Sequence, residues 1–472
     1  MDKLCGLASG TERERGMKTS FALCALATAL ATVEVQAQPA RVTDRDIVES
    51  YQYMLGRWLV LRQENLDFKD GMKWNQIVHR EPGGVDWANP NLDVVYSEAW
   101  IAVDEKSCTL IELPDIKGRY YTVQALNGWG EVTANINERN YPKHPFGKFA
   151  FCLKGAKGII LPKGTQRVDL PSRKSRILMR IELGANPADA VTLQKKVTMK
   201  ATGSPVVEPA VVKPDFPNSK LPGVEGFDKT EEILASEADL NVGMIDVRDK
   251  THAVAKAAAD PAQRARIDEV IRKYAIPASQ GEIQKIGKVV NGWVRPRLIG
   301  NYRTDYVMRS IANYTGIWAN NSKEVVYFAG QGLDGGQTYT QTYPKDALPV
   351  SKTRYFWSVV AVDGADFKVI PNSLKRYLLN KQSALKFNDD GSLTLVFGPK
   401  QPDGIPESNW MPTPAGKKYN LTYRFYGPSK DVSDGTYYPP PLVRISETQT
   451  EKFIHGLKKS TEDVIRRRKK NE

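Results

Sequence analysis

Histidine and cysteine are scarce in this 472-residue chain, which contains four of each. The histidines are His79, His144, His252 and His455, and no two of them are closely spaced. A protein zinc site needs three or four ligands that converge on the ion. We therefore expect the protein to have no metal site, and nothing in the sequence indicates a cofactor.

The motifs of the common enzyme classes are also missing. The chain has no Gly-x-Ser-x-Gly, no His-Glu-x-x-His, no Cys-x-x-Cys and no phosphate-binding Gly-Lys-Ser/Thr loop. Gly330, Gly332 and Gly335 have the spacing of a dinucleotide-binding loop, but such a loop must open a helix. The residues that follow, GQTYTQTYP, are typical of a strand, so these glycines predict a turn between two strands.

Long apolar runs are absent apart from Phe21–Val33, which is too short to span a bilayer comfortably. It follows Met17-Lys18 and precedes Val35-Gln36-Ala37, the pattern of a secretory signal with a cleavage site before Gln38. Residues 1–37 are therefore interpreted as an upstream extension and a signal peptide. We expect a periplasmic or secreted protein without a transmembrane segment.

Removal of the signal would leave two cysteines, Cys108 and Cys152, both in predicted strands of the N-terminal half. An oxidising compartment permits a disulfide between them. Two buried free thiols are the alternative, and the sequence leaves both open.

Basic residues outnumber acidic ones, 67 to 54, for a net charge of +13. This charge favours non-specific contact with anionic surfaces, but no nucleic-acid-binding motif accompanies it. The C-terminal residues 446–472 form a predicted basic amphipathic helix that ends in RRRKK. It is either a solvated element or a peripheral contact with an anionic membrane surface.

The distribution of periodic segments predicts two β modules separated by helices. A helix over 43–65 is capped by Thr43 and opens an N-terminal β module over 43–200. Residues 201–227 are rich in proline and indicate a linker, residues 228–300 a mainly helical insert, and residues 301–445 a second β module. Asp260 and Pro261 start one insert helix, whose apolar stripe is predicted to be Ile267, Val270, Ile271 and Tyr274.

Seven sequence motifs resemble a known pair of families. The C-terminal half contains DGSLTLVFGP, PESNWMPTP and KKYNLTYRFYGP between Asp390 and Pro428, and NSKEVVYFAGQGLDGGQTYTQTYP and KTRYFWSVVAVD upstream. The N-terminal half contains NPNLDVVYSEAWIAVDE and LPDIKGRYYTVQALNGWGEV, with Val94 where relatives commonly have threonine. Together these segments resemble bacterial exported proteins that pair domain-of-unknown-function families 1254 and 1214. The resemblance implies a β-rich α+β chain with two sandwich or jelly-roll-like modules, and the alternating strands agree with it.

Two groups of side chains are candidates for ligand binding. The first is Asn91, Asp93, Tyr96 and Trp129, together with Trp87, Asn89 and Asn127, because aromatic rings and amides suit a polar, ring-bearing ligand. The second is Arg424 with Trp357 and Trp410, where the guanidinium could hold a carboxylate.

The predicted function has two alternatives. The first is a cell-envelope protein that binds a polar small molecule or glycan. The second is a metal-independent periplasmic hydrolase that uses carboxylates such as Asp86, Asp93 and Glu98. The sequence leaves open whether the protein is an enzyme, and it does not give the oligomeric state.

Overall fold

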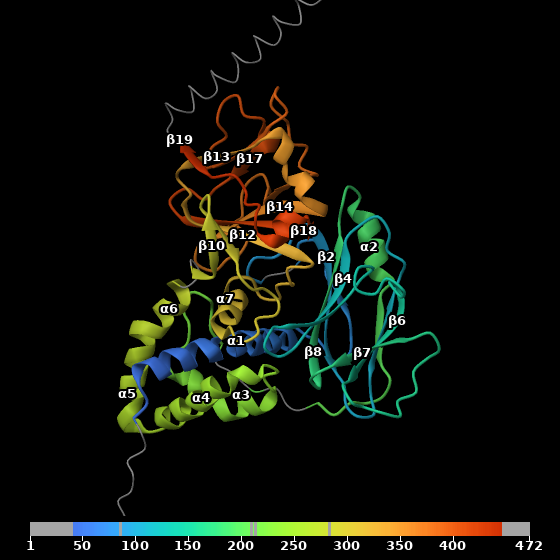
Figure 1. Ribbon diagram of the computed structural model, residues 1–472, viewed down its shortest axis with the longest axis vertical. Helices are drawn as coiled ribbons and strands as arrows, with labels where there is room; N and C mark the ends of the chain where they lie inside the picture. The colour runs from blue at the N-terminus through green and yellow to red at the C-terminus, as the bar shows by residue number, and fades with distance from the viewer. Residues whose placement is uncertain (1–40, 85–86, 208–210, 212–214, 282–284, 446–472) are drawn as a thin grey trace, which may run out of the picture. The chain divides into compact units, whose positions relative to one another are not determined.

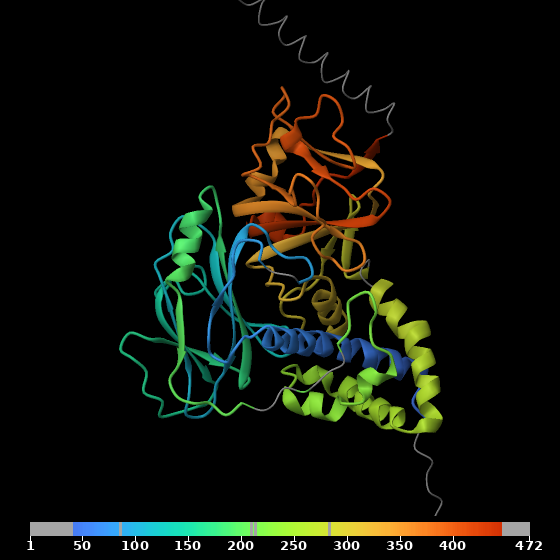
Figure 2. The same ribbon diagram turned by 180° about the vertical axis from the view of Figure 1, so that it is seen from behind.

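The computed structural model describes residues 41–84, 87–207, 211, 215–281 and 285–445 (Figures 1 and 2). The predicted signal segment, Asp86 and the predicted C-terminal helix lie outside these residues. The architecture is β-rich α+β, as the sequence predicted. No helix in the described part of the chain is both long and apolar enough to cross a bilayer.

Helix α1 (Asp44–Lys69) begins where the sequence predicted, and it ends four residues beyond the predicted end at residue 65. The Thr43 hydroxyl accepts from the Asp46 amide at 3.1 Å, and the Asp46 carboxylate accepts from the Thr43 amide at 3.0 Å. This reciprocal pair satisfies two amides that the first turn would otherwise leave unpaired. The predicted helix start is therefore confirmed.

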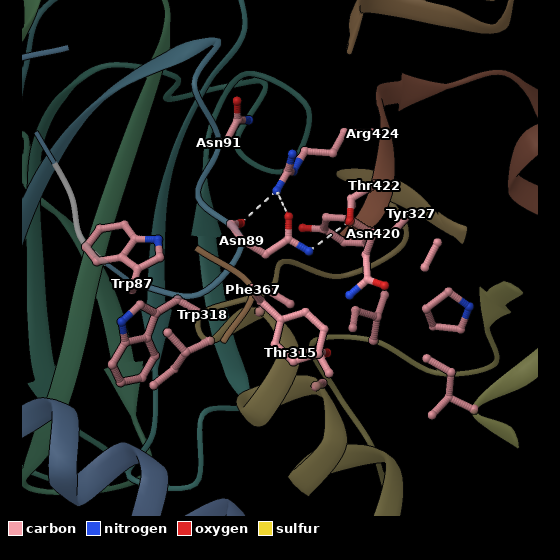
Figure 3. Close-up of a pocket in the computed structure, with 18 of the residues that line it drawn as sticks. Trp87, Asn89, Asn91, Thr315, Trp318, Tyr327, Phe367, Asn420, Thr422 and Arg424 are labelled. Carbon is pink, nitrogen blue, oxygen red and sulfur yellow. Dashed lines mark hydrogen bonds between the residues drawn. The ribbon is translucent and has the colours of Figure 1, made fainter. Parts of the chain in front are cut away.

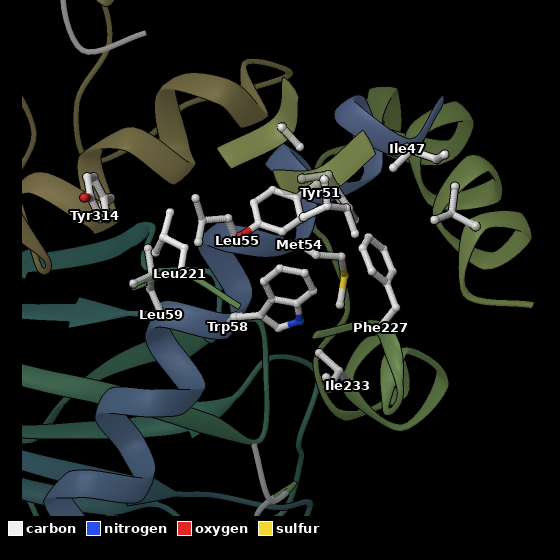
Figure 4. Close-up of a cluster of buried hydrophobic side chains, with 14 of the residues drawn as sticks. Ile47, Tyr51, Met54, Leu55, Trp58, Leu59, Leu221, Phe227, Ile233 and Tyr314 are labelled. Carbon is white, nitrogen blue, oxygen red and sulfur yellow. The ribbon is translucent and has the colours of Figure 1, made fainter. Parts of the chain in front are cut away.

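The middle of α1 is buried on all sides, because other helices cover it (Figures 1 and 4). Tyr51 meets Trp58 edge-to-face at 5.2 Å, and Trp58 meets Phe227 at 5.4 Å. The surrounding helices are α3 (Thr230–Ser236), α4 (Ile245–Ala258), α5 (Pro261–Val270), α6 (Ile276–Gly281) and α7 (Tyr306–Gly316). Short turns of 3-10 helix lie at Val224–Phe227 and Val242–Met244, and one π-helical turn lies at Ile271–Ala275.

The N-terminal module is a sandwich of two mainly antiparallel sheets. In pairing order, the first sheet contains β1 (Val78–His79), β2 (Val94–Ala102), β8 (Lys174–Glu182), β4 (Tyr121–Leu126) and β5 (Val132–Ile136). The second contains β7 (Gln166–Leu170), β6 (Gly147–Leu153), β3 (Thr109–Leu113) and β9 (Thr198–Ala201), and α2 (Pro187–Lys195) leads into β9. Their facing side chains form one apolar core that includes Val95, Phe149, Phe151 and Ile177.

A disulfide joins Cys108 and Cys152 at one end of this module. Cys108 directly precedes β3 and Cys152 lies on β6, which is the neighbour of β3 in the second sheet. Both cysteines are fully buried.

The helical region departs from the prediction in three ways. Residues 287–296 form two strands, β10 (Gly287–Val290) and β11 (Trp293–Pro296), where a helix was expected, because Asn291-Gly292 makes a tight turn with both residues at positive φ. Tyr274 is 46% exposed, so it is not part of the apolar stripe, whereas Ile267, Val270 and Ile271 are buried. Helix α7 occupies the start of the segment assigned to the second β module.

The C-terminal module is a second sandwich. Its larger sheet contains β10, β11, β12 (Val325–Asp334), β18 (Lys418–Pro428), β14 (Thr353–Asp363) and β15 (Leu378–Asn380). Its smaller sheet contains β17 (Trp410–Pro412), β16 (Leu393–Gly398), β13 (Thr338–Tyr343) and β19 (Val443–Ile445). Helix α8 (Lys430–Asp434) and 3-10 turns at Lys345–Ala347, Pro349–Lys352 and Glu407–Asn409 complete the module.

The alternation predicted for the C-terminal strands is confirmed. Leu393, Leu395 and Phe397 of β16 face the core, as do four residues of β18: Tyr419, Leu421, Tyr423 and Phe425. The glycine triplet is not a nucleotide loop, since it lies at the end of β12 and in the turn to β13.

Candidate functional site

The two β modules meet through the outer faces of their larger sheets. On β8, residues 177, 179 and 181 point into the N-terminal core, which leaves Arg176, Leu178, Arg180 and Glu182 on the opposite face. On β18 the corresponding outer residues are Asn420, Thr422, Arg424 and Tyr426. Both outer faces are buried against each other and against α1 and the segment after α7. Polar strand residues are therefore enclosed, and each needs a partner.

A pocket lies in this layer (Figure 3). Its cavity volume is ≈ 90 Å³. All the space between atoms in this region, including the opening to solvent, amounts to ≈ 810 Å³. Its polar lining consists of Asn89, Asn91, Arg180, Thr315, Gln331, Asn420, Thr422 and Arg424. Its aromatic lining consists of Trp87, Tyr96, Trp318, Tyr327, Phe367 and Tyr426, and no aspartate or glutamate is among the described residues that line it.

Arg424 is held in the pocket by neutral acceptors. Its side chain is 2% exposed, and its Nη2 donates to the carbonyl oxygen of Asn89 at 2.6 Å and to the Asn89 Oδ1 at 2.7 Å (Figure 3). The Asn89 amide in turn donates to the Thr422 hydroxyl at 2.9 Å. The other terminal nitrogen of Arg424, Nη1, has no hydrogen-bond partner among the described residues.

Arg180 is a second buried guanidinium with the same kind of surroundings. It donates to the Gln124 side-chain oxygen and, at 2.9 Å, to the carbonyl of Trp318, and it lies over the Tyr96 ring at 5.5 Å. Tyr96 is its direct neighbour across the β2–β8 pairing. Its Nε lacks a partner, and among the described ion pairs none includes Arg180 or Arg424.

Two further buried donors in the pocket lining are unpaired, namely the Asn91 Nδ2 and the Trp318 Nε1. Asn91 uses its Oδ1 to accept from the Asp93 amide at 2.8 Å, so its NH₂ group is the free end of the side chain. Four described residues of the pocket lining therefore have a buried N–H group without a partner, and none of the described lining residues has an unpaired buried acceptor. A buried unpaired donor costs about 1–3 kcal/mol, so a bound acceptor that reached one of these groups would gain from pairing it.

Three pocket residues have left-handed backbone conformations: Asn89 at φ 55°, Trp318 at φ 67° and Phe367 at φ 63°. Asparagine tolerates this region, but it is unusual for an aromatic residue. The backbone N–H of Asn89 donates to the Phe367 carbonyl at 2.7 Å, so two of these three residues are linked by a hydrogen bond. Such conformations cost about 1–3 kcal/mol each and concentrate at functional sites.

Two tyrosine hydroxyls of the pocket lining accept hydrogen bonds from backbone amides. Burial raises the pKa of Tyr327 and outweighs the opposing charges of Arg180 and Arg424. The Tyr327 hydroxyl accepts from the Asn320 amide at 3.2 Å, and the Tyr96 hydroxyl accepts from the Asn91 amide at 3.0 Å. The raised pKa keeps the Tyr327 hydroxyl protonated, so it can donate to a bound molecule.

The structure brings three of the five predicted ligand residues together: Asn91, Tyr96 and Arg424 line the pocket, with Trp87 and Asn89 beside them. Asp93 and Trp129 are not in its lining. Trp129 is fully buried in the helical core, with the Arg309 guanidinium 4.2 Å from its ring centre. Asn127 holds the turn at Trp129 by accepting from its amide at 3.0 Å.

Asp93 makes a side-chain hydrogen bond between the two modules. It is 5% exposed, and its Oδ1 accepts from the Asn380 Nδ2 at 2.6 Å. Burial raises its pKa, against the hydrogen bond from Asn380 and the charge of Arg424. Glu98, the other described carboxylate considered for hydrolysis, pairs with Arg176 and Arg80 in the buried interior.

The tryptophans grouped with Arg424 also lie outside the pocket lining. Trp357 is in the core of the C-terminal sandwich, and Trp410 donates from Nε1 to the Gly398 carbonyl at 2.9 Å. The residues that the sequence interpretation missed are Arg180, Trp318, Tyr327, Asn420 and Thr422. Asn420 and Thr422 share the strand face of Arg424, which is a signal that alternation alone could have given.

The described histidines lie apart from this pocket and have other partners. His79 Nδ1 is 2.8 Å from the Ser97 hydroxyl, His144 Nε2 is 3.2 Å from the Lys148 carbonyl, and His252 Nδ1 is 2.7 Å from Glu231. Within the residues the structure describes, no three His, Cys, Asp or Glu side chains form a group that could hold a metal ion.

Two family models match parts of this chain. Residues 74–201 match the family model "Protein of unknown function (DUF1254)", and residues 326–430 match "Protein of unknown function (DUF1214)". No curated protein matches the chain. The crystal structure of the VPA0106 protein from Vibrio parahaemolyticus is similar in fold, with a TM-score of 0.57 and 18% identity over 86% of this chain and 100% of that one. A putative uncharacterised protein from Burkholderia cenocepacia matches at a TM-score of 0.42 and 11% identity, covering 86% of this chain and 96% of that one.

Proposed function

We propose that this chain, which joins an N-terminal DUF1254 module to a C-terminal DUF1214 module, is an exported binding protein for a small organic anion. The observation that supports the proposal most is that four residues of one pocket lining have a buried donor without a partner among the described residues. Two of the donors belong to guanidinium groups, whose planar geometry matches a carboxylate. The aromatic lining would pack against the apolar part of the molecule.

The electrostatics of the pocket favour an anion over a neutral ligand. Arg180 and Arg424 are 4% and 2% exposed, and their hydrogen bonds to described residues go to amide and carbonyl oxygens. A buried charge without a counter-ion is expensive, whereas a carboxylate in the pocket would neutralise it. Asp93 lies near enough to feel the charge of Arg424, but it is engaged with Asn380 outside the pocket lining.

Binding without turnover fits this lining better than hydrolysis. A carboxylate hydrolase needs two acids that flank the bond it cleaves, and none is present among the described residues that line the pocket around Arg424 and Arg180. Export to the periplasm or the outside of the cell is part of the proposal and is supported by the signal-like pattern at Met17–Ala37.

Native mass spectrometry of the purified protein after incubation with pooled carboxylates, phosphate esters and neutral metabolites would test the proposal. We expect an intact carboxylate to be retained. Arg424→Gln should weaken its binding by about 10- to 100-fold, the effect of losing a charge-assisted hydrogen bond. Arg376→Gln is the matched control, because Arg376 pairs with Glu407 outside the pocket lining.

Two results would contradict the proposal. Capture of only neutral molecules, with the same affinity in the Arg424→Gln variant, would show that the guanidinium does not bind the ligand. Release of a chemically altered product would show that the protein is an enzyme. Retention of only phosphate esters would leave the anion site in place but replace the carboxylate.

A further inference from the structure

A second and larger cavity adjoins the pocket described above. Its volume is ≈ 480 Å³, and its walls come from α1, from α7 and from residues 215–219 and 366–368. Trp87 and Ile317 line both cavities, so the indole ring of Trp87 stands at the boundary between them. We refer to the pocket with Arg424 as the inner pocket and to this cavity as the outer chamber.

The outer chamber is bounded by an ordered wall. The Asn218 Nδ2 donates to the Tyr314 carbonyl at 2.8 Å, and the Tyr314 hydroxyl donates back to the Asn218 carbonyl at 3.1 Å. Arg62 of α1 donates to the Phe216 carbonyl at 2.9 Å and stacks on the Phe216 ring at 4.8 Å. The wall segment is therefore fastened to two helices.

The chemistry of the outer chamber differs from that of the inner pocket. One buried donor, the Arg62 Nε, and one buried acceptor, the Asn218 Oδ1, lack partners. Asp215 and Asp366 add acceptors to the lining. The inner pocket has only unpaired donors, whereas the outer chamber offers both kinds of group. A hydroxyl both donates and accepts, so hydroxyl groups satisfy the outer chamber better than a second carboxylate would.

We propose that the inner pocket and the outer chamber are two halves of one site for an acidic saccharide. The carboxylate occupies the inner pocket beside Arg424 and Arg180, and a hydroxylated ring occupies the outer chamber. Trp87 is 8% exposed and supplies a flat apolar surface between the two, of the kind that packs against a sugar ring. This inference rests on the proposed function and adds the class of ligand to it.

Isothermal titration with four sugars tests this inference: glucuronic acid, cellobiouronic acid, and the neutral sugars glucose and cellobiose. We expect cellobiouronic acid to bind at least tenfold more tightly than glucuronic acid, and both to bind more tightly than the neutral sugars. Arg424→Gln should abolish the preference for the acidic sugars.

Filling the outer chamber isolates its contribution. Ser219 is exposed and lines the chamber, so Ser219→Trp should remove the tenfold gain of the disaccharide and leave glucuronic acid unchanged. Lys220→Trp places the same side chain on the next exposed residue, which is not in the lining, and should have no effect. If Ser219→Trp lowers the melting temperature, Ser219→Leu replaces it as a smaller obstruction.

The outcomes distinguish this inference from the function on which it rests. Equal affinity for the acidic monosaccharide and disaccharide, or a disaccharide gain that survives Ser219→Trp or Ser219→Leu, overturns the shared site. Binding of other carboxylates but of neither acidic sugar also overturns it, while leaving the anion-binding function intact. Failure of every carboxylate to bind overturns both.

Discussion

At the residue scale, two buried arginines of β8 have different hydrogen-bond partners and therefore different charge balance. Arg176 is buried with Glu98 and Asp67 as partners, so its charge is neutralised within the protein. Arg180, four residues later on the same strand face, has only neutral acceptors and leaves its Nε unpaired. The two arginines therefore differ in their partners, whereas their burial is similar.

Asp93 provides a prediction at this scale. Its pKa is raised, chiefly by burial, so the folded state holds the proton more tightly than the unfolded state does, whose pKa is about 3.9. Its contribution to stability is therefore present below the unfolded pKa and is lost as pH rises through the folded pKa. Asp93→Asn keeps an oxygen for Asn380 and removes the charge, so the melting temperature of the variant minus that of the wild type should increase from pH 4 towards neutrality.

Thermal melts between pH 4 and 8 would measure this difference. Arg424 and Glu182 are the charged groups that act on Asp93 in opposite directions, so both must stay unchanged in the variant. Asp403→Asn, at an exposed residue, is the control and should give a flat difference. A flat difference for Asp93→Asn too would contradict the prediction, as would a fall with rising pH.

At the element scale, the β12–β13 hairpin shows how glycines determine a turn. A side chain on Gly335 would overlap the backbone carbonyl oxygen of Pro414, whereas one on Gly336 would meet the Asp334 carboxylate at an ordinary 3.4 Å. The close approach of two backbones therefore requires glycine at 335 but not at 336. The glycine spacing that could suggest a nucleotide loop is explained by packing.

These two neighbouring glycines allow a matched comparison. Gly335→Ala should lower the free energy of unfolding by about 1–3 kcal/mol, because the backbone must move to admit a methyl group. Gly336→Ala should change it by less than about 1 kcal/mol, and in the stabilising direction if the turn accepts alanine. Urea unfolding of both variants would measure this, and equal effects would show that the approach to Pro414 is not restrictive.

At the scale of the whole molecule, two sandwiches share a buried polar layer between their larger sheets. Three side-chain hydrogen bonds cross this layer: Asn380 donates to Asp93, Asn89 to Thr422, and the Tyr120 hydroxyl to Glu324. The inner pocket lies in the same layer, so a ligand there touches residues of both modules. Binding should therefore raise the melting temperature of the whole chain.

The Cys108–Cys152 disulfide also belongs to the molecular scale, because it depends on the compartment. Intact-mass analysis of exported protein without reductant should show a chain that begins at Gln38 and lacks two thiol hydrogens. The bridge spans 44 residues, and replacing both cysteines by serine should lower the free energy of unfolding by about 2–5 kcal/mol. A mass that includes residues 17–37, or two thiols open to alkylation in the native protein, would contradict this.

The sequence by itself determined the features that depend on near neighbours in the chain. The Thr43–Asp46 cap, the Asp260–Pro261 helix start and the alternation of β16 and β18 follow from residues a few positions apart. The family pairing followed from continuous motifs of the same kind. Asn91, Tyr96 and Arg424 were identified because each lies on or beside a strand with unusual polar chemistry.

Only the tertiary structure decided which of these residues share a pocket. Asp93 and Asn91 are two positions apart, yet one bonds to Asn380 and the other lines the pocket, because the distant β15 lies against one of them. Arg180 and Trp318 are 138 positions apart in the sequence, and only the folded structure places them in one pocket, joined by a hydrogen bond. The unpaired donors on which the proposed ligand rests also depend on the packing of the two modules. Whether a buried N–H group has a hydrogen-bond partner is decided by that packing, and no local sequence pattern encodes it.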